Sequence, residues 1–460
     1  MSEINFAKYR QIYFLGIGGI GMSALARFFN TQNYSIAGYD KVRTTLCEQL
    51  ENEGMHIHYN DDVSLIPPQF LRADDTLVVY TPAIPKDHTE WNYLQEQQFT
   101  ILKRAQVLGL ISKHYQTIAV AGTHGKTTIS TMTTHLLNSS SLKANGFLGG
   151  ISKNYHSNMV LSSESKMVVT EADEFDRSFL NLFPNMALIS SMDADHLDIY
   201  GEHEALQASF VSFVDQIHEQ GTLVYKKGLP MPEKRSIQYY TYAIDNPEAD
   251  FYASHIQLQN ELYQFDLESP LGRFENLILG IPGIVNLENA IGASALAVLN
   301  GVKAHELREG LKTYQGVLRR FDYQIRTPKL VYIDDYAHHP EELKAFISSV
   351  RKIYPTRKLT GIFQPHLYSR TKDFAEGFAQ SLSLLDQVFL MDIYPARELP
   401  IPGVSSEMIF KDIKIDDKHL TSKANLLELL KNHKFDVLLT MGAGDIDTFV
   451  KPLKTWLESK

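Results

Sequence analysis

Short apolar runs alternate along this chain with longer segments in which apolar and polar residues recur at helical spacing. Many of the runs are rich in β-branched and aromatic residues and end in glycine or in polar residues, as buried strands of a parallel sheet do. Strands that alternate with helices predict the α/β fold class. The predicted strands are Ile12–Leu15, Ser35–Tyr39, Thr76–Tyr80, Thr117–Val120, Met167–Thr170, Ala187–Ser190, Leu330–Ile333, Leu359–Phe363, Val388–Met391 and Val437–Thr440.

One segment departs from this pattern. Residues 221–280 are rich in Tyr, Phe, Ile and Thr, and apolar and polar positions alternate there. Such alternation is typical of half-buried strands, so we expect a small antiparallel β insertion. The chain then leads from Pro282–Gly292 into an apolar helix that ends near Asn300–Gly301, a normal C-terminal stop.

The length of 460 residues corresponds to about three domains. We predict a first domain at residues 1–113, a second at 114–318 and a third at 319–460. Hydrophobic residues make up 44% of the chain and charged residues 21%, which is ordinary globular composition. The formal net charge of −10 argues against a generic nucleic-acid binder, because no basic excess offsets phosphate charge.

The single cysteine, Cys47, excludes an intrachain disulfide and a cysteine-rich metal site, and it fits a reducing compartment. The first residues lack the basic-then-apolar layout of a signal peptide. No apolar run approaches membrane-spanning length. We therefore expect a cytoplasmic protein without membrane insertion.

The predicted strand Thr117–Val120 is followed by the loop Ala121–Gly125 and by a helix that opens with Lys126 and Thr127. A glycine-containing turn and a helix N-terminus present unpaired backbone N–H groups to an anion. The lysine would add charge at the β- and γ-phosphates, and the threonine hydroxyl would ligate Mg²⁺. The motif G-x-x-x-x-G-K-[ST] is incomplete because Val120 occupies its first glycine position. The pattern still predicts that the protein binds ATP or GTP.

Two further residues follow neighbouring predicted strands. Glu171 follows Met167–Thr170, and His196 comes shortly after Ala187–Ser190. The carboxyl ends of parallel strands lie at one edge of a sheet, so both side chains are expected near Thr127. Magnesium takes oxygen ligands and often one or two carboxylates, and a histidine is acceptable among them. The alternative is that the acidic run Glu171–Glu174 is a solvated loop and that His196 is a hydrogen-bonded surface residue.

The segment Gly16–Gly21 lies between the strand Ile12–Leu15 and a predicted helix, and the next strand ends at Asp40. This G-x-G-x-x-G arrangement is the fingerprint of dinucleotide binding. The same turn would equally hold the diphosphate of a UDP-sugar, and the motif does not separate the two ligands. The loop Thr81–Pro85 follows another strand and is a candidate wall of this site.

Polar and cationic residues also follow the strand ends of the third predicted domain. Three stretches follow predicted strands, namely Asp334–His339, Gln364–Arg370 and Met441–Asp445, and Arg319–Phe321 opens the domain. Pro340 follows the stretch Asp334–His339 and is suited to the first turn of a helix.

Taken together and in order, these motifs resemble the Mur ligase family of peptidoglycan synthesis over nearly the whole chain. The stretches that carry the resemblance are GIGGIGMSALA at Gly16–Ala26, AGTHGKTT at Ala121–Thr128, EADEFDRSFL at Glu171–Leu180, DADHLD at Asp193–Asp198, NLENA at Asn286–Ala290, RRF at Arg319–Phe321, DDYAHHP at Asp334–Pro340 and FQPHLYSRT at Phe363–Thr371.

The resemblance implies three domains: an N-terminal Rossmann-like domain for the UDP-sugar, a central P-loop ATPase domain with a mostly parallel sheet, and a C-terminal Rossmann-like domain for the amino acid. It implies a ligase that joins L-alanine to the lactyl carboxylate of UDP-N-acetylmuramate through an acyl phosphate. The implied cofactors are ATP and Mg²⁺, with Mn²⁺ as a substitute and without NAD. We expect a monomer or a weak homodimer.

The resemblance also assigns residues to roles. It implies that ATP is bound by Gly122, Thr123, His124, Gly125, Lys126, Thr127, Thr128, Asn286, Asn289, Arg320 and Asp335. It implies that the UDP-sugar is bound by Gly16, Gly18, Gly19, Ile20, Gly21, Asp40, Thr81 and Arg104. The amino acid would be surrounded by Tyr336, His338, His366 and Arg370. The metal ligands would be Thr127, Glu171 and His196, and the catalytic groups Lys126, His196, Arg320 and His338.

The chain departs from the family pattern at several positions. Ser191 and Val285 stand where the family often has Asn and His, which bears on how adenine packs. Leu367 replaces a frequent Arg, so Arg370 is the clearer cation of its segment. The helical segment Glu202–Ile217 contains no lysine, so the carbamylated lysine of several relatives is not expected there.

Three other functions fit parts of the sequence. An NAD-dependent oxidoreductase would use Gly16–Gly21 and Asp40 but would leave the phosphate loop and Glu171 without a purpose. A nucleotide-binding switch would not need the cationic third domain. A ligase that attaches a tripeptide to the same sugar is the alternative within the family, and the segment Phe363–Thr371 favours the single amino acid.

Overall fold

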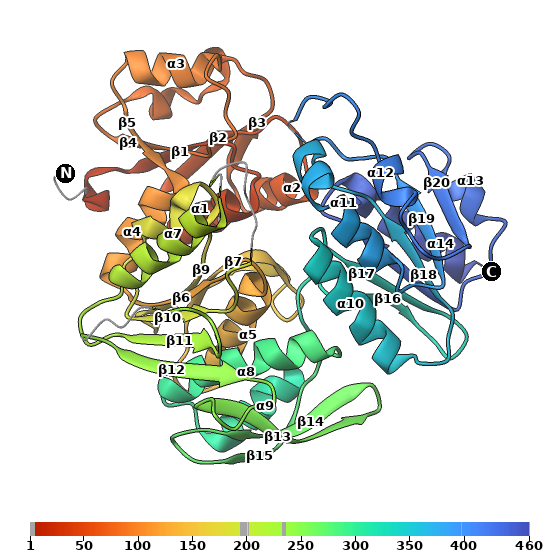
Figure 1. Ribbon diagram of the computed structural model, residues 1–460. Helices are drawn as coiled ribbons and strands as arrows, with labels where there is room; N and C mark the ends of the chain where they lie inside the picture. The colour runs from red at the N-terminus through yellow and green to blue at the C-terminus, as the bar shows by residue number, and fades with distance from the viewer. Residues whose placement is uncertain (1–4, 194–199, 201, 232–235, 397, 460) are drawn as a thin grey trace. The chain divides into compact units, whose positions relative to one another are not determined.

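The computed structural model describes residues 5–193, 200, 202–231, 236–396 and 398–459. These residues form three sheets of five, ten and six strands (Figure 1). The chain divides into two compact units. The first unit comprises Met1–His255, Phe265–Leu277 and Asn289–Tyr314, and the second comprises Ile256–Gln264, Ile278–Glu288 and Gln315–Lys460.

The first sheet has five parallel strands in the order β3-β2-β1-β4-β5. The chain order in this sheet reverses between β1 and β4, and ligands of such sheets bind outside the carboxyl ends of the strands at that point. Its strands are β1 (Gln11–Leu15), β2 (Ser35–Tyr39), β3 (His56–His58), β4 (Thr76–Tyr80) and β5 (Thr100–Lys103). Its helices are α1 (Ile20–Thr31), α2 (Thr45–Asn52), α3 (Thr89–Glu96) and α4 (Arg104–His114).

Both faces of the first sheet are covered, which explains why its central strands β1 and β4 are apolar at nearly every position. In β1, Ile12 and Phe14 pack into one hydrophobic cluster together with residues of α1. Tyr13 and Leu15 point to the other face and pack with Leu94 of α3. Successive side chains of a strand alternate between faces, so a strand that is buried on both sides loses the apolar-polar alternation.

The second sheet has ten strands in the order β15-β14-β13-β12-β11-β10-β6-β9-β7-β8. Its strands are β6 (Gln116–Ala121), β7 (Asn145–Ser152), β8 (Ser157–Val160), β9 (Met167–Ala172), β10 (Met186–Ile189), β11 (Thr222–Lys226), β12 (Gln238–Ala243), β13 (Phe251–Gln259), β14 (Leu262–Glu268) and β15 (Phe274–Ile278). The associated helices are α5 (Lys126–Asn138), α7 (His203–Asp215), α8 (Ile284–Leu299) and α9 (Ala304–Thr313). Because β10, β6, β9 and β7 run parallel, the loops after them lie at one edge.

The prediction of an antiparallel insertion at residues 221–280 is wrong for its first part. Strand β11 pairs parallel with β10, and β12 pairs parallel with β11 and with β13. The alternating pattern reports a half-buried strand and carries no information about strand direction. Strands β13 and β14 form a hairpin through Asn260 and Glu261, whose φ angles of 51° and 68° suit the two-residue turn of a twisted hairpin.

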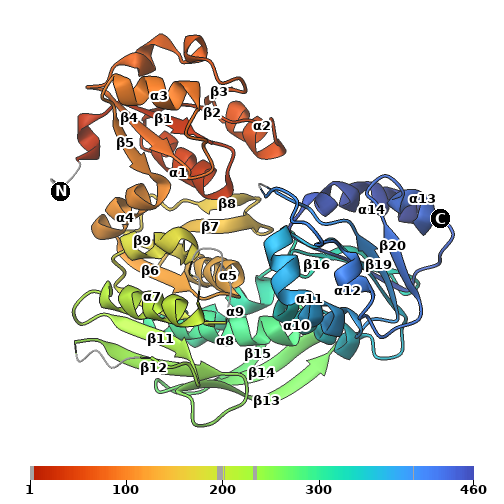
Figure 2. The same ribbon diagram turned by 45° about the horizontal axis from the view of Figure 1, so that its top comes forward.

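The third sheet has the order β16-β17-β21-β18-β19-β20, in which β16 is antiparallel to β17 and the other pairs are parallel. Its strands are β16 (Asp322–Arg326), β17 (Val331–Asp335), β18 (Leu359–Phe363), β19 (Gln387–Met391), β20 (Lys418–Thr421) and β21 (Val437–Met441). Its helices are α10 (Pro340–Ile353), α11 (Tyr368–Leu382), α12 (Glu407–Phe410), α13 (Leu426–Leu430) and α14 (Val450–Glu458). Helices α10 and α11 cover one face and α13 and α14 the other (Figure 2).

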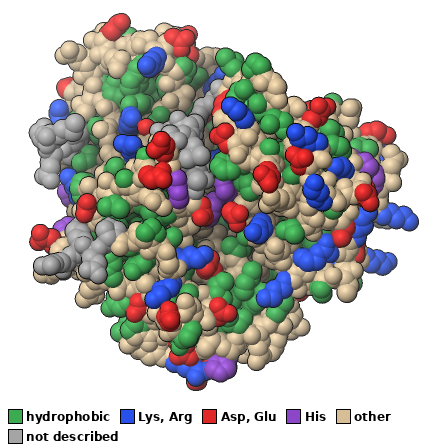
Figure 3. All heavy atoms as spheres, viewed as in Figure 1, with side chains coloured by type: hydrophobic (Ala, Val, Ile, Leu, Met, Phe, Trp, Pro, Cys, Tyr) green, Lys and Arg blue, Asp and Glu red, His purple; other side chains and the backbone are tan. Residues whose placement is uncertain are grey.

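Short 3₁₀ helices complete the fold, namely η1 (Phe6–Lys8), η2 (Val63–Leu65), η3 (Pro68–Leu71), η4 (Phe175–Asn181) and η5 (Asp445–Phe449). The predicted α/β class is confirmed, whereas the predicted domain boundaries stay a prediction. Acidic and basic side chains are interspersed on the face shown in Figure 3. Within the described residues, no helix is both long and apolar enough to cross a bilayer.

Candidate active site

The phosphate loop joins β6 to α5 and depends on two glycines. Gly122 and Gly125 adopt φ angles of +130° and +86°, which side-chain-bearing residues rarely adopt. A Cβ at Gly122 would clash with Ser190 Oγ, and one at Gly125 would lie 2.8 Å from Asn289 Oδ1. Asn289, which is predicted to bind ATP, therefore lies against this loop. Thr128 follows in the first turn of α5 and is buried.

The end of β10 braces the phosphate loop. The backbone N–H of His124 donates to Ser191 Oγ at 2.8 Å, and the hydroxyls of Thr123 and Ser191 lie 2.9 Å apart. The backbone N–H of Asp193 donates to Thr123 Oγ1 at 3.1 Å. His124 Nε2 lies 3.5 Å from Asp193 Oδ2. Ser191, which sequence analysis identified only as a departure from the family pattern, thus fixes the loop conformation.

Lys126 is the first residue of α5, and a buried carboxylate holds its ammonium group. Lys126 Nζ donates to Gly122 O at 2.7 Å and lies 2.8 Å from both Oε atoms of Glu174. Burial alone would lower the pKa of Lys126, but the charges of Glu174, Asp173 and Glu171 outweigh it and raise that pKa to about 12. Burial also raises the pKa of Glu174. We regard the pair as ionic, because the ammonium group contacts both oxygens of Glu174.

Sequence analysis did not single out Glu174. The residue ends the acidic run Glu171–Glu174, and nothing in the sequence distinguishes it from the other acidic residues of that run. The side chain of Glu174 is fully buried. A buried carboxylate is costly unless it is paired, and its burial is therefore the feature that marks it as important.

Glu171 lies within β9, beside Val120 of β6, and not in the loop after the strand. The backbone N–H of Gly149 donates to Glu171 Oε1 at 3.0 Å, and Ser130 Oγ lies 3.5 Å from the same oxygen. Burial raises the pKa of Glu171, whereas hydrogen bonding from the Thr127 side chain and the charge of Lys126 act in the opposite direction. The structure thus brings Thr127, Lys126 and Glu171 together.

The hydroxyl of Thr127 and the carboxylate of Glu171 are oxygen ligands of the kind that magnesium prefers. Magnesium usually keeps several waters and takes one or two protein carboxylates together with substrate phosphates, so a small protein ligand set suffices. The third predicted ligand, His196, lies outside the described residues. In the part of the chain that the structure describes, His, Cys, Asp and Glu side chains form no group of three or more suited to a metal.

The turn after β1 is built as a close approach of backbone to neighbouring side chains. A Cβ at Gly16 would lie 2.5 Å from Thr81 Cγ2, and one at Gly21 would lie 2.7 Å from Arg104 Nη1. The backbone N–H of Gly18 donates to Asp40 Oδ2 at 2.8 Å. The structure brings these predicted UDP-sugar residues together. Gly19 and Ile20 complete the turn and are solvent-exposed.

A small cavity of about 10 Å³ is lined by residues of two predicted sites. Arg104, predicted to bind the UDP-sugar, and Glu171, predicted to bind the metal, both line it, as does Asp173. Arg104 Nη2 lies 3.9 Å from Asp173 Oδ2.

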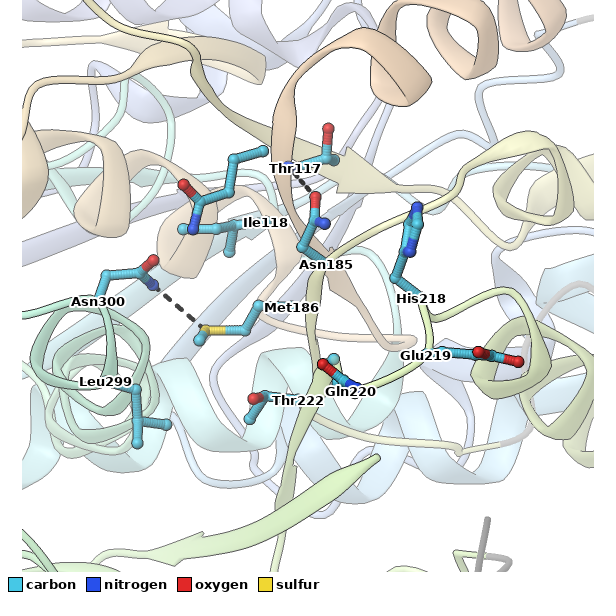
Figure 4. Close-up of a pocket in the computed structure, with 12 residues that line it drawn as sticks. Thr117, Ile118, Asn185, Met186, His218, Glu219, Gln220, Thr222, Leu299 and Asn300 are labelled. Atoms are coloured by element: carbon cyan, nitrogen blue, oxygen red, sulfur yellow. Dashed lines mark hydrogen bonds between the residues drawn. The ribbon is translucent and has the colours of Figure 1, made fainter. Parts of the chain in front are cut away.

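A larger cavity of about 230 Å³ lies at the other edge of the second sheet (Figure 4). It is lined by the first residues of β6, β10 and β11 and by the end of α8, including Thr117, Met186 and Asn300. None of the predicted site residues lines this cavity.

In the second unit, Arg319 and Arg320 differ in their surroundings. Arg319 donates through Nη2 to Gly442 O at 2.6 Å and lies 3.3 Å from Asp334 Oδ2, so it is held by the fold. Arg320 keeps 30% of its side chain exposed, and its Nη1 lies 3.8 Å from Glu342 Oε1. The predicted catalytic residue Arg320 is therefore the more available cation.

Asp335 ends β17 and is buried. Its Oδ2 accepts from the backbone N–H of Phe321 at 2.7 Å, and its Oδ1 accepts from that of Ala337 at 2.8 Å. Burial raises the pKa of Asp335 to about 6, although the charge of Arg320 and the two backbone hydrogen bonds act in the opposite direction. Both carboxylate oxygens thus organise the segment between Arg320 and Ala337. Asn286, also in this unit, donates from Nδ2 to Pro282 O at 2.6 Å.

Three of the four residues that are predicted to bind the amino-acid substrate lie in one cluster. His338 Nδ1 lies 3.1 Å from Glu342 Oε2 and 3.1 Å from Tyr336 O. The rings of His338 and His366 meet edge to face with their centroids 6.0 Å apart. The guanidinium of Arg320 lies 5.0 Å from the centre of the Tyr336 ring. Tyr336, His338, His366 and Arg320 are therefore neighbours.

Arg370 lies in the first turn of α11 and is only 7% exposed. The preceding Leu367 has a φ of +71°, which is strained for a residue with a side chain. Its backbone N–H donates to Tyr394 O at 2.9 Å, and its carbonyl accepts from Thr371 N at 3.1 Å. Strain that is held by surrounding hydrogen bonds is common where a fold positions functional groups.

Comparison with known proteins covers all three sheets. Residues 11–116 match the Mur ligase family catalytic domain, residues 120–297 match the Mur ligase middle domain, and residues 319–444 match the Mur ligase glutamate ligase domain. A UDP-N-acetylmuramate–L-alanine ligase of Parabacteroides distasonis is 51% identical over 449 residues, which are 97% of each chain. The ligase of the same name from Porphyromonas gingivalis is 49% identical and covers 98% of this chain and 99% of its own.

Solved structures agree with these matches. The crystal structure of UDP-N-acetylmuramate–alanine ligase from Thermotoga maritima superposes with a TM-score of 0.81 at 26% identity, over 98% of this chain and 100% of that one. A murein peptide ligase from Psychrobacter arcticus shares the fold, with a TM-score of 0.71 at 22% identity over 97% of this chain and 98% of that one. The resemblance inferred from the motifs is confirmed, and the chain belongs to the Mur ligase family.

Proposed function

We propose that this chain is the ATP-dependent ligase that joins L-alanine to the lactyl carboxylate of UDP-N-acetylmuramate in peptidoglycan precursor synthesis. The observation that carries the proposal is the identity of about half of all residues, over the full length, with ligases of that name. The geometry supports the use of ATP, because a glycine loop, a helix N-terminus and a buried lysine ion pair occur together.

The reaction has two steps. In the first, the lactyl carboxylate attacks the γ-phosphorus of ATP, and an acyl phosphate and ADP form. In the second, the amine of L-alanine attacks the acyl carbon, and inorganic phosphate leaves as the amide bond forms. The first step brings two anions together, and the cations Lys126 and Arg320 would offset their repulsion.

A divalent ion completes this proposal. Mg²⁺, or Mn²⁺ in its place, would neutralise phosphate charge when held by Thr127 and Glu171, with His196 as the third proposed ligand. The remaining phosphate contacts are assigned to the backbone of Gly122–Gly125. Asn286, Asn289 and Asp335 are proposed for adenosine.

We assign the turn Gly16–Gly21 to the UDP-sugar and not to NAD. Glycines that admit a diphosphate do not specify what the diphosphate carries, so family membership supports this choice and the turn alone does not. Asp40, Thr81 and Arg104 are proposed as its side-chain contacts, and all three lie beside the turn.

The amino acid is assigned to the cluster in the second unit. Arg370 would bind the carboxylate of L-alanine, and Tyr336, His338 and His366 would surround the amine. A bidentate guanidinium suits a carboxylate. We further expect a cytoplasmic enzyme that acts as a monomer or weak homodimer.

ADP release measured with UDP-N-acetylmuramate and each of L-alanine, L-serine, glycine and tripeptide tests the proposal. We expect the highest kcat/KM with L-alanine. Preference for the tripeptide would replace the proposal with the tripeptide ligase. ATP hydrolysis that is equally fast without any amino acid or sugar would indicate a nucleotide switch. Micromolar NAD binding in calorimetry, without UDP-N-acetylmuramate binding, would reverse the assignment of Gly16–Gly21.

A further inference from the structure

Asn158 is a fully buried residue of β8 whose side chain is bonded entirely to α1. Its Nδ2 donates to Ile20 O at 2.5 Å and to Ser23 Oγ at 2.9 Å. Its Oδ1 accepts from Arg27 Nη1. An asparagine amide has two N–H donors and one carbonyl oxygen, so each of these groups is used on the same helix.

Arg27 makes this attachment rigid. Its side chain is 7% exposed, and its Nε and Nη2 atoms donate to the carboxylate of Glu53 at 2.7–3.0 Å. Its Nη2 also lies 3.2 Å from Gln49 Oε1. Charge-assisted hydrogen bonds of this kind fix a guanidinium in one orientation. The group that Asn158 holds is therefore itself fixed within the first sheet's helical layer.

Both ends of this contact lead to a proposed substrate site. Ile20 belongs to the Gly16–Gly21 turn and is the first residue of α1. Asn158 therefore bonds to the helix at its N-terminus, the end that favours an anion. Strand β8 pairs with β7, and Gly149 of β7 donates to Glu171. The β7–β8 hairpin thus contacts the sugar turn through one strand and a proposed metal ligand through the other. Figure 2 shows α1 lying against these two strands.

We propose that Asn158 is a positioning residue that sets the UDP-sugar turn in its place relative to the phosphate loop. The inference rests on the proposed function, because that reaction needs a sugar held at the first sheet to reach the γ-phosphate of ATP held at the second. Displacement of a reacting group by about 1 Å can cost a factor of 10² in rate. A contact that fixes the first turn of α1 also keeps its N–H groups aimed at the diphosphate.

The chain offers a matched control in Asn145 of β7. Asn145 is 5% exposed and also makes three hydrogen bonds, but its partners are Ser162 N, Ser165 O and Met167 O, all within the second sheet and its loops. Loss of either asparagine leaves buried polar groups without partners and lowers stability. Only Asn158→Ala releases the sugar turn.

The experiment compares wild type, Asn158→Ala and Asn145→Ala by calorimetry with UDP-N-acetylmuramate and with ATP, and by steady-state kinetics. We expect Asn158→Ala to raise the Kd of the UDP-sugar about tenfold and to lower kcat, with the Kd of ATP within twofold of wild type. We expect Asn145→Ala to leave both Kd values within twofold. Equal effects of the two variants on the UDP-sugar, or none from Asn158→Ala, would overturn the inference.

A second variant guards against misfolding of the first. Asn158→Asp keeps an acceptor for Arg27 but has no N–H for Ile20 O, so we expect it to share the loss of UDP-sugar affinity while Arg27 stays paired. Wild-type affinity in Asn158→Asp would also overturn the inference. Absence of ligation by the wild-type enzyme would instead refute the proposed function, and the two failures are therefore distinguishable.

Discussion

The backbone N–H of Gly149 donates a hydrogen bond to Glu171 Oε1 at 3.0 Å, and a Cβ at Gly149 would clash with both oxygens of that carboxylate. The clash at Gly149 thus comes from the close approach of the Glu171 carboxylate and not from backbone conformation, and the carboxylate would have to move to relieve it. One carboxylate oxygen is held by Gly149, and the carboxylate as a whole cannot shift toward β7. A side chain at position 149 would push the proposed metal ligand out of place.

We therefore predict that Gly149→Ala raises the magnesium concentration for half-maximal ligation about tenfold. Glu171→Gln should raise it in the same direction, because a neutral amide oxygen is a weaker ligand for a hard cation than a carboxylate. Magnesium titrations of ADP release, together with Mn²⁺ binding measured by electron paramagnetic resonance, check both variants.

Ser152→Ala on the same strand is the control, because Ser152 is buried and its hydroxyl makes no hydrogen bond among the described residues. It should titrate as wild type does. A Gly149→Ala curve that overlays the wild type would remove Gly149 from the metal site, and an overlaying Glu171→Gln curve would remove Glu171.

Lys126→Ala should lower kcat by about 10²–10³, because an electrostatic contact at the transferred phosphoryl group is lost. The same variant leaves the buried carboxylate of Glu174 without its ammonium partner. Breaking one side of a buried ion pair typically costs roughly 3–5 kcal/mol of unfolding free energy. Kinetics and denaturant unfolding measure the two effects separately.

The double variant Lys126→Ala/Glu174→Gln separates catalysis from folding. Replacing the Glu174 carboxylate by a neutral amide should restore much of the unfolding free energy, while kcat should stay as low as in Lys126→Ala. A folded Lys126→Ala protein with near-native kcat would show that Lys126 has no part in phosphoryl transfer.

Glu90 of α3 predicts a pH dependence of stability. Its Oε2 accepts from the Tyr13 hydroxyl at 2.6 Å, and its side chain is fully buried, which raises its pKa to about 7. The folded-state pKa of Glu90 lies above its ordinary value, so folding favours the protonated carboxyl. The contribution of protonated Glu90 to the free energy of unfolding is therefore complete below about pH 4.5 and is lost as the pH rises through 7. The amide of Glu90→Gln stays neutral. This variant should therefore not show the decrease in unfolding free energy, on the order of 3 kcal/mol, that Glu90 causes in wild type between these pH values.

Denaturant unfolding of wild type and Glu90→Gln from pH 4.5 to 7.5 measures this difference. His58 Nε2 lies 3.5 Å from Glu90 Oε1, so the difference between the two proteins reports Glu90 together with its coupling to this imidazole. Glu96→Gln, on the exposed side of the same helix, should keep the wild-type slope. Parallel curves for wild type and Glu90→Gln would contradict the assignment of a raised pKa to Glu90.

Local sequence was sufficient where one strand or one turn carries the signal. Strands β2 and β18 have the predicted bounds, Ser35–Tyr39 and Leu359–Phe363, because nearly every residue of each is buried on one face or the other. Strand β7 was not predicted, because Asn145–Ser152 contains three glycines and has no clear period. Its strand conformation is stabilised by pairing with β8 and β9.

The candidate site divides in the same way. Lys126 and Thr127 follow from a contiguous motif, since strand, turn and helix start are adjacent in sequence. Glu174 and Asn158 do not, because each acquires its partner only when distant segments pack together. Glu174 is 48 residues from Lys126, and Asn158 is 138 residues from Ile20. Pairings of this kind depend on tertiary structure, and neither residue belongs to a motif that names its partner.

Arg370 separates the two halves of the proposed reaction. It is nearly buried in the first turn of α11, after the strained Leu367, and this burial argues against an ordinary surface arginine. If its guanidinium binds the carboxylate of L-alanine, Arg370→Ala should raise the KM for L-alanine with a loss of about 1.5–3 kcal/mol, as for a charged hydrogen bond. Arg370→Lys keeps the charge but lacks the bidentate guanidinium, so its KM for L-alanine should lie between those of wild type and Arg370→Ala.

The KM values for ATP and UDP-N-acetylmuramate should stay close to wild type, because Arg370 is assigned to the second step alone. Acyl-phosphate formation without alanine, trapped by borohydride reduction, should persist in Arg370→Ala. The exposed Lys372 of the same helix provides a matched control, and Lys372→Ala should leave every constant unchanged. Loss of the trapped acyl phosphate, with an unchanged dependence on alanine, would assign Arg370 to phosphoryl transfer, and the amino-acid site would then have to be sought elsewhere.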